Sequence, residues 1–251
     1  MIKAVYFDID GTLIPFGQSQ MPPDTKQALD KLQQKGIKVF ICTGRVPPLN
    51  LPGIQNFNFD GYVTSNGQYI YLNDGTIISK QVFSRESLSH LFDYIEKENI
   101  PLTVASLSGS YRNNSQYDAH LPIKNPKTLL DLEIVQLMAF IPPEKDVDFL
   151  THIPEAKSAR WTSIFADIIP ITGGKNVGIE KMNRFFGYSL DEVMCFGDGG
   201  NDISMLRAIP HSIAMGNATD EVKAAASYTT DACDHQGISK ALIHFGLIEA
   251  F

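Results

Sequence analysis

The sequence predicts an α/β fold: a doubly wound, mostly parallel sheet with a second, α+β domain inserted into the chain. Strand-like and helix-like segments alternate in the first and last thirds of the chain, as they do in βαβ units. The middle third lacks this alternation, because one helical segment is followed by several strand-like runs. We therefore expect a core made of residues 1–81 and 171–251, interrupted by an inserted domain at 82–170.

Apolar runs rich in β-forming residues predict the strands, and amphipathic segments that end near Gly predict the helices. In the core, we expect strands at 4–9, 38–42, 59–65, 69–72, 76–79, 193–196, 212–215 and 228–230. We expect core helices at 23–35 and 176–186, one ending at 208, and others starting near 219 and 237. In the insert, we expect helices at 84–98 and 143–151 and strands at 102–107, 135–141, 158–162 and 164–169.

The composition is that of an ordinary globular protein. The chain has 251 residues, of which 43% are hydrophobic and 20% charged, with a formal net charge of −7. This acidic balance argues against a nucleic-acid partner, because phosphate backbones require clustered Lys and Arg. The three cysteines have no metal-binding spacing, and we find no signal peptide and no membrane-spanning run. We expect a cytoplasmic protein without a membrane partner, and the oligomeric state cannot be read from the sequence.

Two carboxylates follow the first predicted strand directly. Asp8 and Asp10 lie one residue apart, and Gly11 allows a sharp backbone turn next to them. A carboxylate held against phosphorus can act as a nucleophile, and a second one can carry the proton of the leaving group. A calcium-binding EF-hand loop also begins in this way, but it requires Gly at position 6 and Glu at position 12. This chain has Leu13 and Ser19 there, so a calcium loop is excluded.

Two further groups are suited to binding phosphate. Thr43 and Gly44 follow the second predicted strand, where a hydroxyl and backbone N–H groups can hold phosphoryl oxygens. Lys175 stands at a predicted helix start, where its charge opposes the helix dipole unless an anion is nearby. This mismatch favours a functional lysine.

The run Gly-Asp-Gly-Gly-Asn-Asp at 197–202 places Asp198, Asn201 and Asp202 at a strand-to-helix turn. Hard oxygen ligands suit Mg²⁺, and Asp8 with Asp198 would complete a partial shell. Ligands of open α/β sheets bind beyond the carboxyl ends of the strands, so these groups are expected to meet. Together they supply what phosphoryl transfer requires: a nucleophile, an acid/base, a hydroxyl, a lysine and a metal ligand.

These motifs resemble those of the haloacid dehalogenase-like (HAD) superfamily, and specifically its Cof-type (subclass IIB) phosphatases. Three other stretches are similar to signatures of the Cof group. The resemblance implies a Rossmann-like HAD core and makes the inserted segment the α+β cap domain. It rests on D-x-D-G-T at 8–12, Thr43, Lys175, 197–202, Ser-Asn-Gly at 65–67, Ile-Ala-Met-Gly-Asn-Ala at 213–218 and Asp-His-Gln-Gly-Ile at 234–238.

The resemblance also implies a role for each site residue. Asp8 would attack phosphorus and bind Mg²⁺. Asp10 would protonate the leaving oxygen, later activate water, and lend its backbone carbonyl to the metal. Asp198 would bind Mg²⁺, and Asp202 would support the metal shell or orient Lys175. The phosphoryl oxygens would be held by Thr43, Gly44, Lys175 and Asn201.

The expected function is Mg²⁺-dependent hydrolysis of a small phosphorylated metabolite, a sugar phosphate or similar, through an aspartyl phosphate. A phosphomutase of the phosphomannomutase type is one alternative, and it would need a dense basic site in the cap. The other alternative is a non-catalytic protein that binds a phosphorylated metabolite. Such a protein would have lost Asp8 or Asp10, and this chain has both. Candidate basic or substrate-facing cap residues are Tyr111, Arg112, Asn113 and Asn114 in an expected polar loop, with Lys124, Lys127, Arg160 and Trp161.

Overall fold

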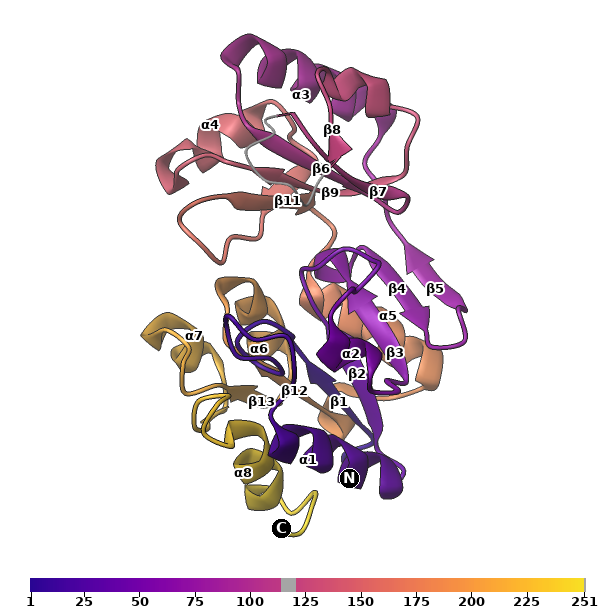
Figure 1. Cartoon of the computed structure of the whole chain (residues 1–251), viewed down its shortest axis with the longest axis vertical. Coiled ribbons are helices and arrows are strands. Elements are labelled where there is room, and N and C mark those ends of the chain that lie inside the picture. The colour runs from indigo at the N-terminus through magenta and orange to yellow at the C-terminus, as the bar shows by residue number, and fades with distance from the viewer. Residues whose placement is uncertain (114–120, 251) are drawn as a thin grey trace. The chain divides into compact units, whose positions relative to one another are not determined.

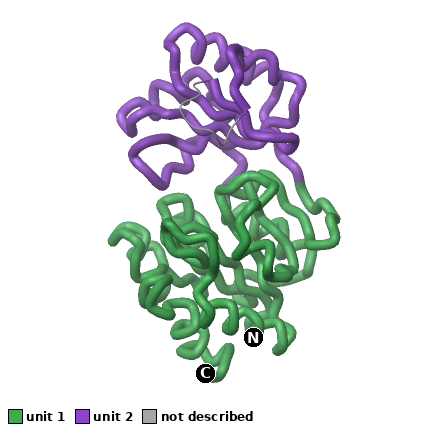
Figure 2. Tube along the Cα trace, in the orientation of Figure 1, with its two compact units in different colours: residues 1–79, 175–251 green, residues 80–174 purple. Residues whose placement is uncertain are grey.

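The computed structural model describes residues 1–113 and 121–250 (Figure 1). The chain divides into two compact units, residues 1–79 with 175–251 and residues 80–174 (Figure 2). The sequence analysis placed the corresponding boundaries after residue 81 and before residue 171. The assignment of these segments as catalytic core and cap stays a prediction.

An eight-stranded sheet forms the centre of the first unit, in the order β14-β13-β12-β1-β2-β3-β4-β5. In this order, each neighbouring pair from β14 through β13, β12, β1 and β2 to β3 is parallel, and the pair of β3 with β4 is antiparallel. The predicted mostly parallel sheet is therefore confirmed. Its strands are β1 (Ala4–Phe7), β2 (Lys38–Cys42), β3 (Gly61–Thr64), β4 (Tyr69–Leu72), β5 (Ile77–Lys80), β12 (Val193–Gly197), β13 (His211–Ala214) and β14 (Tyr228–Thr229).

Helices cover both faces of this sheet, as a doubly wound fold requires. Val5 and Phe7 of β1 pack with α1 and α8, whereas the alternate residues Ala4 and Tyr6 pack with α5, α6 and α7. Strands buried on both faces are nearly continuous apolar runs, which explains the sequence of β1. The helices are α1 (Pro23–Gln34), α2 (Pro52–Gln55), α5 (Lys175–Phe186), α6 (Ile203–Ala208), α7 (Asp220–Ala225) and α8 (Gly237–His244).

The second unit is an α+β domain. Its six-stranded sheet has the order β10-β11-β9-β6-β7-β8, and every pair except β7–β8 is antiparallel. The apolar stripe of α3 and Phe149 of α4 pack on one face of the sheet. The elements are α3 (Arg85–Glu98), β6 (Leu102–Ser106), β7 (Gly109–Arg112), β8 (Leu121–Pro122), β9 (Ile134–Ala139), α4 (Asp146–Thr151), β10 (Ala156–Ser158) and β11 (Ala166–Pro170).

Two predictions for this unit were wrong. The expected polar loop is strand β7, which pairs with β6, and Asn114 lies outside the described residues. In place of the strand expected at 158–162, the structure has β10, which begins at Ala156 and ends at Ser158. Arg160 lies beyond the end of this strand and forms an ion pair with Asp146. Within residues 1–113 and 121–250, no helix has the length and apolar character needed to cross a bilayer.

Candidate active site

Three predicted clusters lie at neighbouring strand ends. Asp8 follows β1, Thr43 follows β2 and Asp198 follows β12. β1 pairs in parallel with both β2 and β12, so the three carboxyl ends share one edge of the sheet. The backbone N–H of Asp8 also donates to the carbonyl of Phe196, at 3.0 Å. The predicted convergence of these motifs is therefore seen in the geometry.

Lys175 joins two of the acidic residues. It begins α5 and is 1% exposed, and its Nζ lies 2.6 Å from Oδ1 of Asp8. The same nitrogen also donates to Oδ1 of Asp202. A buried ammonium is stable only with such partners. The charge that looked unfavourable at a helix start is compensated here by two buried carboxylates.

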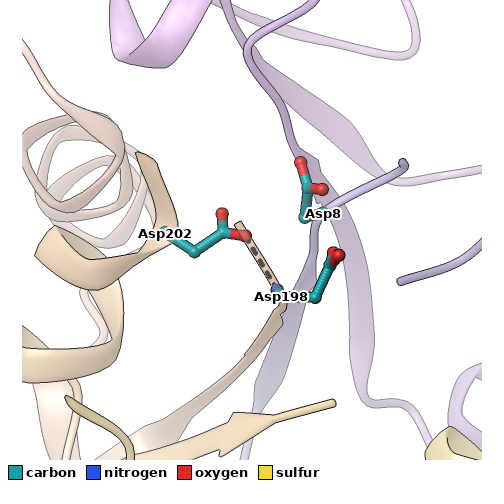
Figure 3. A group of neighbouring side chains, drawn as sticks. All are labelled: Asp8, Asp198 and Asp202. Carbon is teal, nitrogen blue, oxygen red and sulfur yellow. Dashed lines mark hydrogen bonds between the residues drawn. The ribbon is translucent and has the colours of Figure 1, made fainter. Parts of the chain in front are cut away.

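Asp202 is occupied on both oxygens. Oδ1 accepts from Lys175, and Oδ2 accepts the backbone N–H of Gly199, at 2.8 Å. Oδ2 also accepts the backbone N–H of Asp198, at 2.9 Å (Figure 3). Of the two roles predicted for Asp202, this geometry favours orienting Lys175. Asp202 also holds the turn that carries Asp198.

Asp198 is held from two other segments. Its Oδ1 accepts from the hydroxyl of Thr12, at 2.8 Å, and its Oδ2 from the side-chain amide of Asn217, at 3.2 Å. The same Asn217 nitrogen donates to the carbonyl of Gly11, at 2.9 Å. Asn217 therefore links the motif at 8–12 with the run at 197–202, a role that sequence reasoning missed. Its place just after β13 is the signal that could have indicated it.

The acidic group fits a divalent cation. One carboxylate oxygen from each of Asp8, Asp198 and Asp202 lies within 4.8 Å of the other two (Figure 3). Among the described residues, the second Asp8 oxygen accepts no hydrogen bond, since Lys175 contacts only Oδ1. When all three carboxylates are ionised, the one ammonium leaves two negative charges uncompensated. These oxygen donors and this charge suit Mg²⁺.

Burial governs the ionisation of the cluster. It raises the pKa of Asp8, with Lys175 opposing the shift and Asp202 adding to it. Burial, followed by repulsion from Asp202, raises the pKa of Asp198 to about 7. Burial alone would lower the pKa of Lys175, but Asp202 and Asp8 outweigh it and raise the pKa, so the lysine is charged. A cation on the free Asp8 oxygen would favour the carboxylate form of the nucleophile.

The predicted phosphate-binding residues also lie near one another. The side-chain amide of Asn201 donates to Oδ1 of Asn66, at 3.0 Å. A Cβ atom added to Gly44 would lie 3.2 Å from the amide nitrogens of both asparagines. The backbone N–H of Asn66 donates to the carbonyl of Thr43, at 3.0 Å. Asn66, noted in the sequence only as part of a signature, therefore connects the predicted phosphate-binding groups.

Asp10 does not contact the other acidic residues through its side chain. Its two oxygens accept from Nε and Nη2 of Arg45, each at 2.7 Å. Sequence reasoning assigned no role to Arg45, because residue spacing carries no signal for a pair formed between two loops. The hydrogen bonds to Asp10, together with the negative charges of Asp10 and Asp8, raise the pKa of Arg45 although burial opposes this shift.

The candidate specificity residues of the second unit have varied surroundings. Tyr111 packs against the hydrophobic core of that unit, and Arg112 lies 3.9 Å from the ring centroid of Phe140. Trp161 is 44% exposed. Lys127 pairs with Asp93, and Arg160 pairs with Asp146. Two of the cations considered for a phosphomutase are thus neutralised by local carboxylates.

Gly11 is expected to tolerate no side chain. Its φ is +80°, and an added Cβ would lie 2.1 Å from Oδ2 of Asp198 and 2.6 Å from the Phe16 ring. Gly17 has the same φ but no atom within 4 Å of such a Cβ, so Gly17→Ala is a matched control for backbone strain. We expect Gly11→Ala to lower phosphate release at least about tenfold, because it displaces Asp198. Equal rates in the two variants, measured at saturating Mg²⁺, would refute the packing argument.

Comparison with known proteins adds a second line of evidence. The model of the haloacid dehalogenase-like hydrolases matches residues 5–242. YkrA of Bacillus subtilis is 27% identical over 98% of this chain and 99% of its own length. The solved structure of the HAD subclass IIB sugar phosphatase BT4131 is 37% identical, with a TM-score of 0.90, over 98% of this chain and 100% of that one. The similarity extends over both units.

Proposed function

This chain belongs to the haloacid dehalogenase-like hydrolase family and is a phosphatase of its Cof type, and we propose that it hydrolyses a small phosphorylated metabolite through an aspartyl phosphate on Asp8. The observation that carries the proposal is the position of Asp8. It is buried, bound through one oxygen to a charged lysine, and free of hydrogen bonds among the described residues at its other oxygen. Such a carboxylate is oriented for attack on phosphorus.

The reaction proceeds in two displacements at phosphorus. An Asp8 oxygen attacks while the bond to the leaving oxygen breaks, and the proton of Asp10 passes to that oxygen. Water then attacks the same phosphorus and gives its proton to Asp10, while the bond to Asp8 breaks and the carboxylate returns. The protein thus ends the cycle unchanged, with an alcohol and phosphate as products.

The remaining site residues hold and neutralise the phosphoryl group. Lys175 places a positive charge beside the attacking oxygen, and Asp202 orients it. Thr43, Gly44 and Asn201 donate to the phosphoryl oxygens. Bound Mg²⁺ supplies electrostatic stabilisation of the phosphoryl charge, and Asp8, Asp198 and the backbone carbonyl of Asp10 are the groups that would hold it.

For the substrate, we propose a sugar phosphate or a metabolite of similar size, acted on in the cytoplasm. Support comes from the subclass IIB sugar phosphatase, which is 37% identical to this chain. A second relative at 24% identity, YcsE of Bacillus subtilis, is a 5-amino-6-(5-phospho-D-ribitylamino)uracil phosphatase. A substrate panel should therefore span sugar phosphates and 5-amino-6-(5-phospho-D-ribitylamino)uracil.

Phosphate release from this panel is expected to require Mg²⁺ and to stop when EDTA is added. Since the pKa of Asp198 is about 7 without metal, protons compete with Mg²⁺ below that pH. The Mg²⁺ concentration for half-maximal activity should rise as pH falls, by about tenfold or more for each pH unit below 7, because the pKa of Asp8, the other carboxylate ligand, is also raised. Full activity in EDTA, or release from no panel member with Mg²⁺ present, would contradict the proposed function.

A further inference from the structure

Arg45 holds Asp10 through a paired contact. Two nitrogens of one guanidinium contact the two oxygens of one carboxylate, both at 2.7 Å. Such a paired contact fixes the plane and direction of a carboxylate, whereas a single contact leaves it free to rotate. The surface pair of Lys26 with Asp30 shows the contrast, since it has one contact, at 3.2 Å.

The backbone of Arg45 is itself anchored to the site. Its N–H donates to the hydroxyl of Thr43, at 3.1 Å, and its carbonyl accepts from the N–H of Ser65, at 2.9 Å. Ser65 has a φ of +53°, in the left-handed region that a non-glycine residue rarely adopts. Strained residues of this kind persist where the surrounding structure requires them, and they cluster at functional sites.

Stability alone does not account for this arrangement. Both side chains are partly exposed, Arg45 at 44% and Asp10 at 35%, and exposed ion pairs contribute little to folding. Arg45 is the only described residue whose side chain contacts the Asp10 carboxylate in a hydrogen bond. Removing it would leave the carboxylate free to turn, with its backbone still fixed by the hydrogen bond from Gly11 to Ile14, at 2.8 Å.

We propose that Arg45 is a positioning residue for proton transfer, which orients the Asp10 carboxyl group toward the leaving oxygen. This inference rests on the proposed function, in which Asp10 delivers the proton as the leaving oxygen departs from phosphorus. Arg45 forms and breaks no covalent bond. Its effect is therefore limited to steps in which Asp10 gives or takes a proton.

The positioning role of Arg45 can be tested directly by how far the loss of activity in an Arg45 variant depends on the leaving group of the substrate. Phenyl phosphate and p-nitrophenyl phosphate have similar shapes, but phenolate needs a proton to leave well and p-nitrophenolate does not. The ratio kcat/KM reports steps only as far as release of the leaving group, so the later attack by water does not enter. General acid catalysis contributes about 10²- to 10⁴-fold, and a misplaced group loses much of this.

We expect Arg45→Ala to lower kcat/KM for phenyl phosphate by roughly 10- to 100-fold and that for p-nitrophenyl phosphate by less than about threefold. Arg45→Lys keeps the charge but not the paired contact, so it should recover only part of the loss. Arg85→Ala is the control, because it removes the ion pair with Asp131, between more exposed side chains in the other unit. It should leave kcat/KM unchanged for both substrates.

Equal losses for the two substrates would overturn the inference, as would no loss, or full recovery in Arg45→Lys. Melting temperatures of all three variants should stay near that of the parent chain, because the pair is exposed. Asp8→Asn serves as the separate test of the proposed function. If Asp8→Asn is inactive and Arg45→Ala shows equal losses, only the inference about Arg45 fails.

Discussion

Asp8→Asn is expected to lower phosphate release on the order of 10³-fold or more, because the amide cannot form the covalent bond to phosphorus. The fold should be unaffected, since Asn has the shape of Asp and its carbonyl can still accept from Lys175. Burial raises the pKa of Asp8, so ionising this group opposes folding. The melting temperature should therefore stay the same or rise slightly.

Asp30→Asn is the matched control for this substitution. Asp30 forms a surface pair with Lys26 and is remote in sequence from every predicted motif. It should keep full activity. A rate for Asp8→Asn within about tenfold of the Asp30→Asn rate would remove Asp8 from the mechanism.

Lys175→Met is expected to have the largest effect on stability. It removes the one positive charge that contacts both Asp8 and Asp202, and leaves buried carboxylates without a partner. Loss of one partner from a buried ion pair costs about 3–5 kcal/mol of unfolding free energy. Urea unfolding in the presence of a chelator measures this cost.

The loss should depend on pH in a defined direction. Burial already raises the pKa of Asp8 in the folded protein against the opposing charge of Lys175, so without Lys175 this pKa is expected to rise further above its unfolded value. The unfolded state then binds fewer protons, so stability falls as pH rises from the unfolded toward the folded pKa. The variant should thus be less destabilised near pH 5 than near pH 8.

A second substitution separates charge from packing. Lys175→Met combined with Asp202→Asn leaves one fewer buried negative charge, so it should recover part of the stability while remaining inactive. Equal stability of Lys175→Met and the parent chain, with no change in pH dependence, would refute the account of the buried pair.

Much of the first unit could be predicted because its inner strands β1, β2 and β12 are buried on both faces. Such strands are short apolar runs, and the polar motifs stand out where each one ends. The second unit was harder. Strand β7 (Gly109–Arg112) contains Gly and Ser and resembles a loop, and its pairing with β6 and β8 stabilises it as a strand. The preference for a strand there comes from tertiary contacts, which local sequence does not encode.

At the candidate active site too, some residues could be placed from the sequence and others could not. Asp8, Thr43 and Asp198 could be placed together because parallel strands align their carboxyl ends at one edge, whereas Lys175 was expected there from its charge at a helix start. The contacts of Arg45 could not be predicted, because a side-chain pair between two loops depends on the path of both. The choice between metal support and lysine orientation for Asp202 likewise required its hydrogen bonds.

The most direct test of the central claim is mass analysis of the peptide containing Asp8 after rapid acid quench of a single turnover. The account predicts one added phosphoryl group on Asp8, formed before phosphate appears and absent from Asp8→Asn. Phosphate release at the full rate, with no phosphoryl group on this peptide at any time or with the group on another residue, would contradict it.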